Sequence, residues 1–183
     1  LMIVGWAFIP TGIIGLLVYK LVKTYLLGNT NVVIGTLFIG GLFMIIWEKF
    51  PYFAHSTVLR ASQGKQISNL GVKQALVIGV FQAGAIIPGV SRALMTIFGG
   101  MMMGLSRTEA VEFSFLLAIP TMAAATGWDL VKSGWSFTGN EWWLLVTGFI
   151  GAFASALVVV KWLVRFVKKH DFTGFGVYRI ILA

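Results

Sequence analysis

One arginine, Arg92, lies inside a long uncharged stretch of the sequence. Of all segments of the chain, the residues around it are the best suited to binding a ligand or to catalysis. Residues 75–91 before Arg92 and residues 93–106 after it carry no charged side chain. The preceding residues read PGVS, so a helix-breaking proline and glycine and a serine hydroxyl stand beside the guanidinium. An arginine keeps its proton at membrane depth and therefore needs an anion close to it. That anion is either a carboxylate of the chain or a bound ligand.

The sequence leaves two interpretations of Arg92 open. In the first, Arg92 pairs internally with Glu112, or with Glu109, and holds two segments together. In the second, the guanidinium binds a phosphate, helped by the Ser91 hydroxyl and by backbone N–H groups at the start of the next helix. The proline-glycine break favours the anion site, because broken helices in membrane proteins usually line binding sites.

Residues near the arginine complete a candidate site. Gly89 would let the backbone approach a ligand closely, and Thr96 lies about one and a half helical turns further on. Gln82 either hydrogen-bonds the site or satisfies a neighbouring backbone carbonyl. The two histidines, His55 and His170, lie in polar segments, and we expect them to face water. The chain has no cysteine, and we predict no metal ligand in it.

The composition predicts a membrane protein. Of the 183 residues, 58% are hydrophobic and 11% are charged, whereas soluble domains carry roughly 25% charged residues. The net charge of +8 does not indicate nucleic-acid binding, because the basic residues lie between apolar runs and are better explained as topology signals and lipid contacts. We therefore predict an all-α polytopic transmembrane helix bundle, forming one domain over residues 1–183. The predicted spans are residues 1–19, 32–47, 113–128 and 142–160.

The segment 75–106 differs from these spans. Its two apolar arms have 17 and 14 residues, and each is shorter than the ~20 residues that cross a bilayer. The pattern favours a re-entrant helical hairpin over two short membrane-spanning helices. Non-helical backbone at membrane depth must be covered by protein or line a water-filled cavity, and a re-entrant hairpin meets that condition. Residues 48–74 form the long polar loop. The distribution of basic residues places that loop in the cytoplasm and the hairpin tip away from it.

Several motifs resemble the bacterial undecaprenyl-diphosphate phosphatase family of the bacitracin-resistance type. They are FQAGAIIPGVSR at 81–92, GGMMMGLSRTEAVEFSFLLAIPTMAAAT at 99–126 and FGVYRI at 175–180. The resemblance implies a multi-pass enzyme of the bacterial inner membrane, built from two inverted repeats that each carry a re-entrant hairpin, with this chain holding the second. It further implies hydrolysis of undecaprenyl diphosphate to undecaprenyl phosphate and inorganic phosphate. This reaction recycles the carrier lipid of cell-wall synthesis and confers bacitracin resistance.

The resemblance also implies roles for individual residues. The family motif Pro-Gly-x-Ser-Arg-Ser-Gly-x-Thr is matched here except that Ala93 and Leu94 replace its second Ser-Gly pair, which removes one hydroxyl and one glycine. By resemblance, Arg92 binds the diphosphate, and Ser91 and Thr96 hydrogen-bond it. The remaining candidates for the site are the substrate-binding residues Gly89 and Gln82 and the supporting carboxylate of Glu112.

One part of the family pattern is missing from the sequence. A glutamate-rich stretch followed by Pro-x-Ser-Ser-x-Gly-His supplies acid/base carboxylates and a divalent cation site, for Mg or Ca, in the family. We therefore expect the 183 residues to be a fragment that is inactive or nearly so alone, with most cation ligands elsewhere. Two alternatives stay open: half of a lipid transporter or flippase that binds the diphosphate without cleaving it, and a non-catalytic fragment. A homodimer is a further partner to consider.

Overall fold

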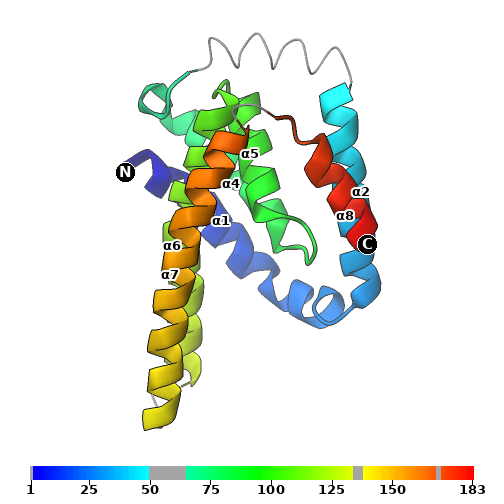
Figure 1. The fold of residues 1–183 in the computed structure, drawn as a ribbon. Helices are drawn as coiled ribbons and strands as arrows, with labels where there is room; N and C mark the ends of the chain where they lie inside the picture. Colours follow the sequence, from blue (N-terminus) through cyan, green and yellow to red (C-terminus); the bar gives the residue numbers. More distant parts are fainter. Residues whose placement is uncertain (1, 50–64, 134–137, 168–169) are drawn as a thin grey trace.

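All regular elements in the described residues are helices. The computed structural model describes residues 2–49, 65–133, 138–167 and 170–183, and it contains seven α-helices in them (Figure 1). These helices are α1 (Met2–Leu21), α2 (Thr30–Lys49), α4 (Val72–Ala83), α5 (Arg92–Met102), α6 (Arg107–Ser133), α7 (Gly139–Val167) and α8 (Thr173–Leu182). Shorter turns of helix are η1 (Val22–Leu26), η2 (Ile67–Asn69) and η3 (Gly84–Ile86).

Among the described residues, four helices are long and apolar enough to cross a membrane, which confirms the predicted all-α fold with several candidate spans. They are Met2–Leu26, Thr30–Lys49, Arg107–Lys132 and Gly139–Val167. The last three extend beyond the predicted runs at both ends, and the first begins at Met2 and continues past residue 19. Pro10 and Pro120 lie inside α1 and α6 without ending them. Transmembrane helices tolerate proline because neighbouring groups satisfy the backbone that it frees.

The helices pack in two groups. α4 packs against α1 and α5, and α5 packs against α6, while α8 packs along α2 (Figure 1). Gly41 and Gly176 let α2 and α8 approach closely, since a Cβ atom on either would lie within 2.8 Å of the other's carbonyl oxygen. The ten residues of α8 are too few to cross a bilayer. The close backbone contact with α2 explains how this short helix holds a defined position.

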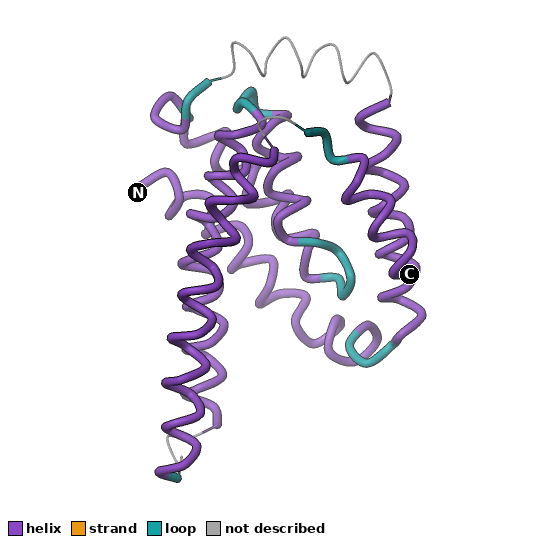
Figure 2. The backbone as a smooth tube through the Cα atoms, in the orientation of Figure 1, coloured by secondary structure: helices purple, strands orange, loops and turns teal. Residues whose placement is uncertain are grey.

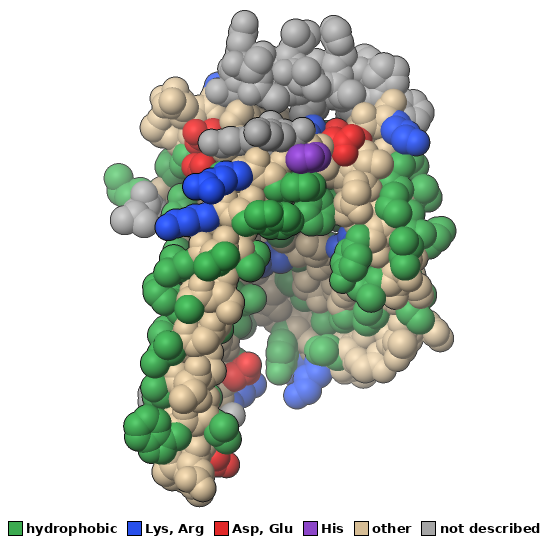
Figure 3. Space-filling view, in the orientation of Figure 1, with side chains coloured by type: hydrophobic (Ala, Val, Ile, Leu, Met, Phe, Trp, Pro, Cys, Tyr) green, Lys and Arg blue, Asp and Glu red, His purple; other side chains and the backbone are tan. Residues whose placement is uncertain are grey.

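The surface agrees with a membrane setting. Charged side chains gather mainly near the two ends of the molecule, and apolar side chains cover α7, α2 and α8 between them (Figure 3). Of the long polar loop predicted at 48–74, Glu48 and Lys49 end α2 and Lys73 lies in α4. Arg60 and His55 lie outside the described residues.

An ion pair joins α2, α6 and the segment before α8. Arg107 Nη2 lies 3.0 Å from Glu48 Oε1, and the two side chains are 18% and 8% exposed. The same carboxylate accepts a hydrogen bond from the backbone N–H of Phe172 at 3.2 Å, and Arg107 donates to the carbonyl of His170 at 3.2 Å. Glu48 therefore fixes the entry to α8.

Glu48→Ala should lower the free energy of unfolding by about 2–3 kcal/mol, because it leaves the partly buried Arg107 cation without its carboxylate and with only the carbonyl of His170 as a hydrogen-bond acceptor. Thermal unfolding in detergent measures the effect. Glu112→Ala removes an exposed carboxylate and should change stability by less than about 0.5 kcal/mol. Equal effects of the two substitutions would contradict the role given to Glu48.

Candidate functional site

The candidate site lies at the turn of a helical hairpin. α4 has 12 residues and α5 has 11, so both arms are shorter than the long helices around them. The chain leaves α4 through η3, becomes extended at Ile87 and passes through Gly89 at φ +86° before α5 begins. Figure 2 shows this turn partway along the length of α6 and α7. The pair of short arms agrees with the predicted break at the proline and glycine.

Two distant helices hold the turn. Thr36 Oγ1 on α2 donates a hydrogen bond to the carbonyl of Pro88 at 2.7 Å, and Arg179 Nη2 on α8 donates to the carbonyl of Gly89 at 2.8 Å. A Cβ atom on Gly89 would collide with the Thr36 hydroxyl and lie 2.8 Å from the carbonyl oxygen of Val33. The close neighbour that requires a glycine here is therefore α2, and an approach of Gly89 to a ligand stays a prediction.

Ser91 and Arg92 begin α5. The Ser91 hydroxyl caps the helix by accepting a hydrogen bond from the backbone N–H of Leu94 at 3.2 Å. Arg92 is half-buried, and its Nη1 donates to the carbonyl of Ser114 on α6 at 3.2 Å. Glu112 is exposed and makes no ion pair with Arg92, so the internal pair considered from the sequence is not formed. Within the described residues, this guanidinium has no carboxylate partner.

Gln82 lies behind the turn and joins four helices. It is 1% exposed, and its Nε2 donates to the hydroxyls of Thr11 on α1 and Thr121 on α6 at 3.1 and 3.2 Å. Those hydroxyls donate their own protons to the carbonyls of Gly79 and Leu117, so they can only accept from the amide. Both amide hydrogens of Gln82 are therefore used within the protein.

Thr96 connects this amide to α5. The side chain is fully buried, and its hydroxyl lies 3.3 Å from Gln82 Oε1 and 2.8 Å from the carbonyl of Arg92. The structure thus brings Ser91, Arg92, Thr96 and Gln82 together around one end of α5. Ligand contacts of Thr96 and Gln82 stay predictions, since both polar groups bond to the protein in this arrangement.

Gln82→Leu should lower the free energy of unfolding by about 1–2 kcal/mol, since interhelical hydrogen bonds in membranes average about 0.6 kcal/mol each. Each threonine hydroxyl keeps a backbone acceptor, which limits the loss. Thermal unfolding in detergent measures the shift. Gln66→Leu, at an exposed position, is the matched control and should leave stability unchanged. A control shift as large as that of Gln82→Leu would contradict the network.

A cavity of about 280 Å³ opens beside the first turn of α5. Its polar lining is provided by Ser91, Tyr178 and Arg179. The other lining residues are apolar: Met44, Ala93, Leu94, Ile97, Phe98, Val111, Leu163, Val167, Phe172 and Phe175. Ala93 and Leu94, which replace Ser-Gly of the family motif, both belong to this wall, so the replacement makes the cavity more apolar.

Arg179 is the site residue that sequence reasoning missed. It is partly buried, it holds the hairpin turn through Gly89, and its Nε is buried without a hydrogen-bond partner among the described residues. The signal was present in the sequence, because Arg179 is a lone charge in the apolar run GFGVYRIILA. An ionisable residue within an apolar segment of a membrane protein indicates function by default.

The described residues do not fit a metal ion. In the described ranges, no three His, Asp or Glu side chains gather closely enough to hold one. His170 is exposed, as expected, and stacks on Phe166 with ring centroids 4.2 Å apart. A divalent cation therefore finds no ligand set in this part of the chain.

The fold and the site define the class: a helical membrane protein whose broken hairpin presents an arginine without a carboxylate partner. The chain belongs to the bacitracin resistance protein BacA family, whose model matches residues 1–183. This result confirms the resemblance seen in the sequence motifs.

Curated relatives are similar over almost the whole chain. The undecaprenyl-diphosphatase of Aquifex aeolicus is 52% identical over 180 residues, covering 96% of this chain and 66% of the relative. The undecaprenyl-diphosphatase of Sulfurihydrogenibium is 44% identical over 176 residues, covering 96% and 67%. That of Thermus thermophilus is 45% identical over 178 residues, covering 97% and 65%. The chain thus spans about two thirds of the length of these relatives.

Proposed function

We propose that a protein carrying this sequence hydrolyses undecaprenyl diphosphate to undecaprenyl phosphate and inorganic phosphate in the bacterial inner membrane. The reaction would recycle the carrier lipid of cell-wall synthesis and confer bacitracin resistance. Family membership and the names of the relatives support the reaction. The observation that carries it is the half-buried Arg92 guanidinium, which has no carboxylate partner in the described structure and suits a diphosphate.

The start of α5 supplies the other groups that would bind the diphosphate. The Ser91 hydroxyl accepts from Leu94, so its own proton is free to be donated to a phosphate oxygen. The first backbone N–H groups of a helix lack intrahelical acceptors and favour an anion. Arg179 lines the adjoining cavity and adds a second cation. In this proposal Thr96 supports the first turn from behind, through its hydrogen bond to the Arg92 carbonyl.

The proposed step is attack of a water oxygen on the terminal phosphorus. The bond from that phosphorus to the bridging oxygen breaks, and its electron pair leaves with undecaprenyl phosphate. Arg92 would stabilise the negative charge that develops on the phosphoryl oxygens. The base that takes the proton of water is not among the described residues near α5, since Glu112 is exposed. We propose that carboxylates and a divalent cation from a further part of the protein complete the site.

We also propose that α4 and α5 form a re-entrant hairpin, the second of two related by inverted repetition. The short arms support re-entry, because neither crosses ~30 Å of hydrocarbon alone. The carbonyl of Pro88 accepts a hydrogen bond from Thr36, and the carbonyl of Gly89 accepts one from Arg179. Within a bilayer, backbone groups outside a helix need such hydrogen-bond partners from the protein. The tip would then point away from the cytoplasm.

Phosphate release from undecaprenyl diphosphate in detergent tests the proposal. A full-length protein carrying this sequence should release one phosphate per lipid and leave the monophosphate. The 183-residue chain should bind the lipid and release little phosphate, because its described residues supply no base near Arg92. If the full-length protein binds the lipid and leaves it intact, a transporter or flippase is favoured. Full rates from the 183-residue chain would contradict the need for further carboxylates.

A further inference from the structure

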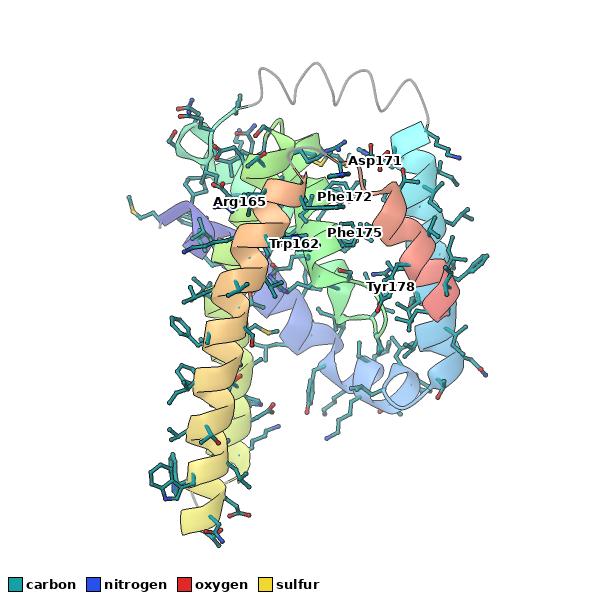
Figure 4. All side chains as sticks on the ribbon, viewed as in Figure 1. Trp162, Arg165, Asp171, Phe172, Phe175 and Tyr178 are labelled. Atoms are coloured by element: carbon teal, nitrogen blue, oxygen red, sulfur yellow. The ribbon has the colours of Figure 1, made fainter. Side chains whose placement is uncertain are left out.

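Two hollows meet at α8. The inner one is the cavity of about 280 Å³ that reaches Ser91 and Arg179, and the outer one is a surface hollow of about 360 Å³. The outer hollow is lined by Trp162, Phe166, Gly174, Phe175 and Tyr178. Phe175 and Tyr178 line both hollows, so the two hollows adjoin at these side chains. Figure 4 shows Trp162, Phe175 and Tyr178 in the space between α7 and α8.

The two ends of this passage differ in chemistry. Its inner end carries the Ser91 hydroxyl and the Arg179 guanidinium, beside the start of α5. Its walls are aliphatic and aromatic, and the Phe166 and Phe175 rings meet edge to face with centroids 5.9 Å apart. Its outer end is open, since Trp162 is 57% and Tyr178 62% exposed. Such a passage matches a molecule with an anionic head and an apolar tail.

We propose that the passage between α7 and α8 binds the first isoprene units of a prenyl diphosphate and leads the rest of its tail sideways into the bilayer. The inference rests on the proposed function, because a diphosphate bound at Arg92 and Ser91 sets where the tail begins, and Ser91 lines the inner cavity. Phe175 and Tyr178 then contact the tail where it passes from the inner cavity to the outer hollow. A tail of five carbons ends inside the cavity, whereas a long tail fills the outer hollow as well.

Gly174→Trp in the full-length protein blocks the outer hollow alone. Gly174 is exposed and lines this hollow, and a Cβ atom added there meets no atom within 4 Å, so the substitution begins without a backbone clash. We expect kcat/KM for undecaprenyl diphosphate to fall about ten-fold, a usual size for an altered apolar pocket. The value for dimethylallyl diphosphate, a five-carbon prenyl diphosphate, should stay unchanged. Equal losses on both substrates, or no loss on the long one, would overturn the proposal.

Gly151→Trp is the matched control. Gly151 is exposed on α7, has the same free space around its Cβ position and lines neither hollow. The same glycine-to-tryptophan change should therefore leave both substrates unaffected. A selective loss on the long substrate from this control would show that any bulky residue on the apolar face has the effect, and would also overturn the proposal.

A binding measurement separates the passage from the reaction. A prenyl diphosphate with a photoreactive diazirine on its second isoprene unit should label Trp162, Phe175 or Tyr178, and the corresponding prenyl alcohol should label them far less. Labelling of the passage without phosphate release would contradict the proposed hydrolysis and would still support the binding site. The binding site itself would be overturned by labelling elsewhere, which would result if another protein segment fills the passage. Equal labelling by the alcohol would also overturn it.

Discussion

Arg92→Ala in the full-length protein is expected to lower phosphate release from undecaprenyl diphosphate by about 10³-fold, the upper range for loss of one charge-stabilising donor. The guanidinium is half-buried beside the hairpin turn and has no carboxylate partner in the described structure, so its charge is available to the substrate. Arg92→Lys should recover only part of the rate, because an ammonium keeps the charge and loses the planar two-point geometry. Initial rates in detergent measure both variants.

Arg165→Ala provides the control for Arg92. Arg165 is an exposed arginine on α7 that lines neither hollow, and its loss should leave the rate unchanged. The stability of Arg92→Ala should change little, since the described contact that it loses is one hydrogen bond to the Ser114 carbonyl. An Arg92→Ala protein that kept its fold and more than a tenth of its rate would refute the role of the guanidinium.

Gly89→Ala should cause the largest loss of stability, about 3–5 kcal/mol. At φ +86° an alanine costs about 1–2 kcal/mol through its own backbone. Its Cβ atom would also push against the Thr36 hydroxyl and the Val33 carbonyl on α2, and the loss of the Thr36 bond to Pro88 would follow. Thermal unfolding in detergent should show a melting temperature well below that of the parent protein.

Gly28→Ala isolates the backbone part of this effect. Gly28 has φ +85°, and nothing lies within 4 Å of its Cβ position. Its substitution should therefore cost only about 1–2 kcal/mol. If both substitutions shift the melting temperature equally, the close approach of α2 to the turn contributes nothing to stability.

The long helices and the broken hairpin could be predicted because they depend on local composition. A run of apolar residues specifies a span, and proline with glycine specifies a break, whatever lies around them. The predicted run 1–19 corresponds to α1, which ends two residues later, and the run 142–160 corresponds to α7, which is longer at both ends. Ends are less predictable, since capping groups and charged residues such as Glu48 continue a helix beyond its apolar part.

The partners of the site residues could not be predicted, because they come from distant helices. Glu112 is near Arg92 in sequence, yet α6 turns that carboxylate outward and presents the Ser114 carbonyl instead. Gln82 meets three hydroxyls from three other helices, and Arg179 reaches a turn 90 residues earlier. These contacts depend on how the helices cross, which no local pattern specifies.

The dependence of the hairpin turn on α8 sets an order for biogenesis. Arg179, the donor to the Gly89 carbonyl, is synthesised 90 residues after Gly89. Thr36, the donor to the Pro88 carbonyl, is synthesised before the turn. During synthesis the Gly89 carbonyl therefore lacks its Arg179 donor until α8 has been made. The site is therefore completed late in synthesis. A nascent chain that stalls before α8 would contain Pro88 to Arg92 and would lack the Arg179 hydrogen bond that supports the turn.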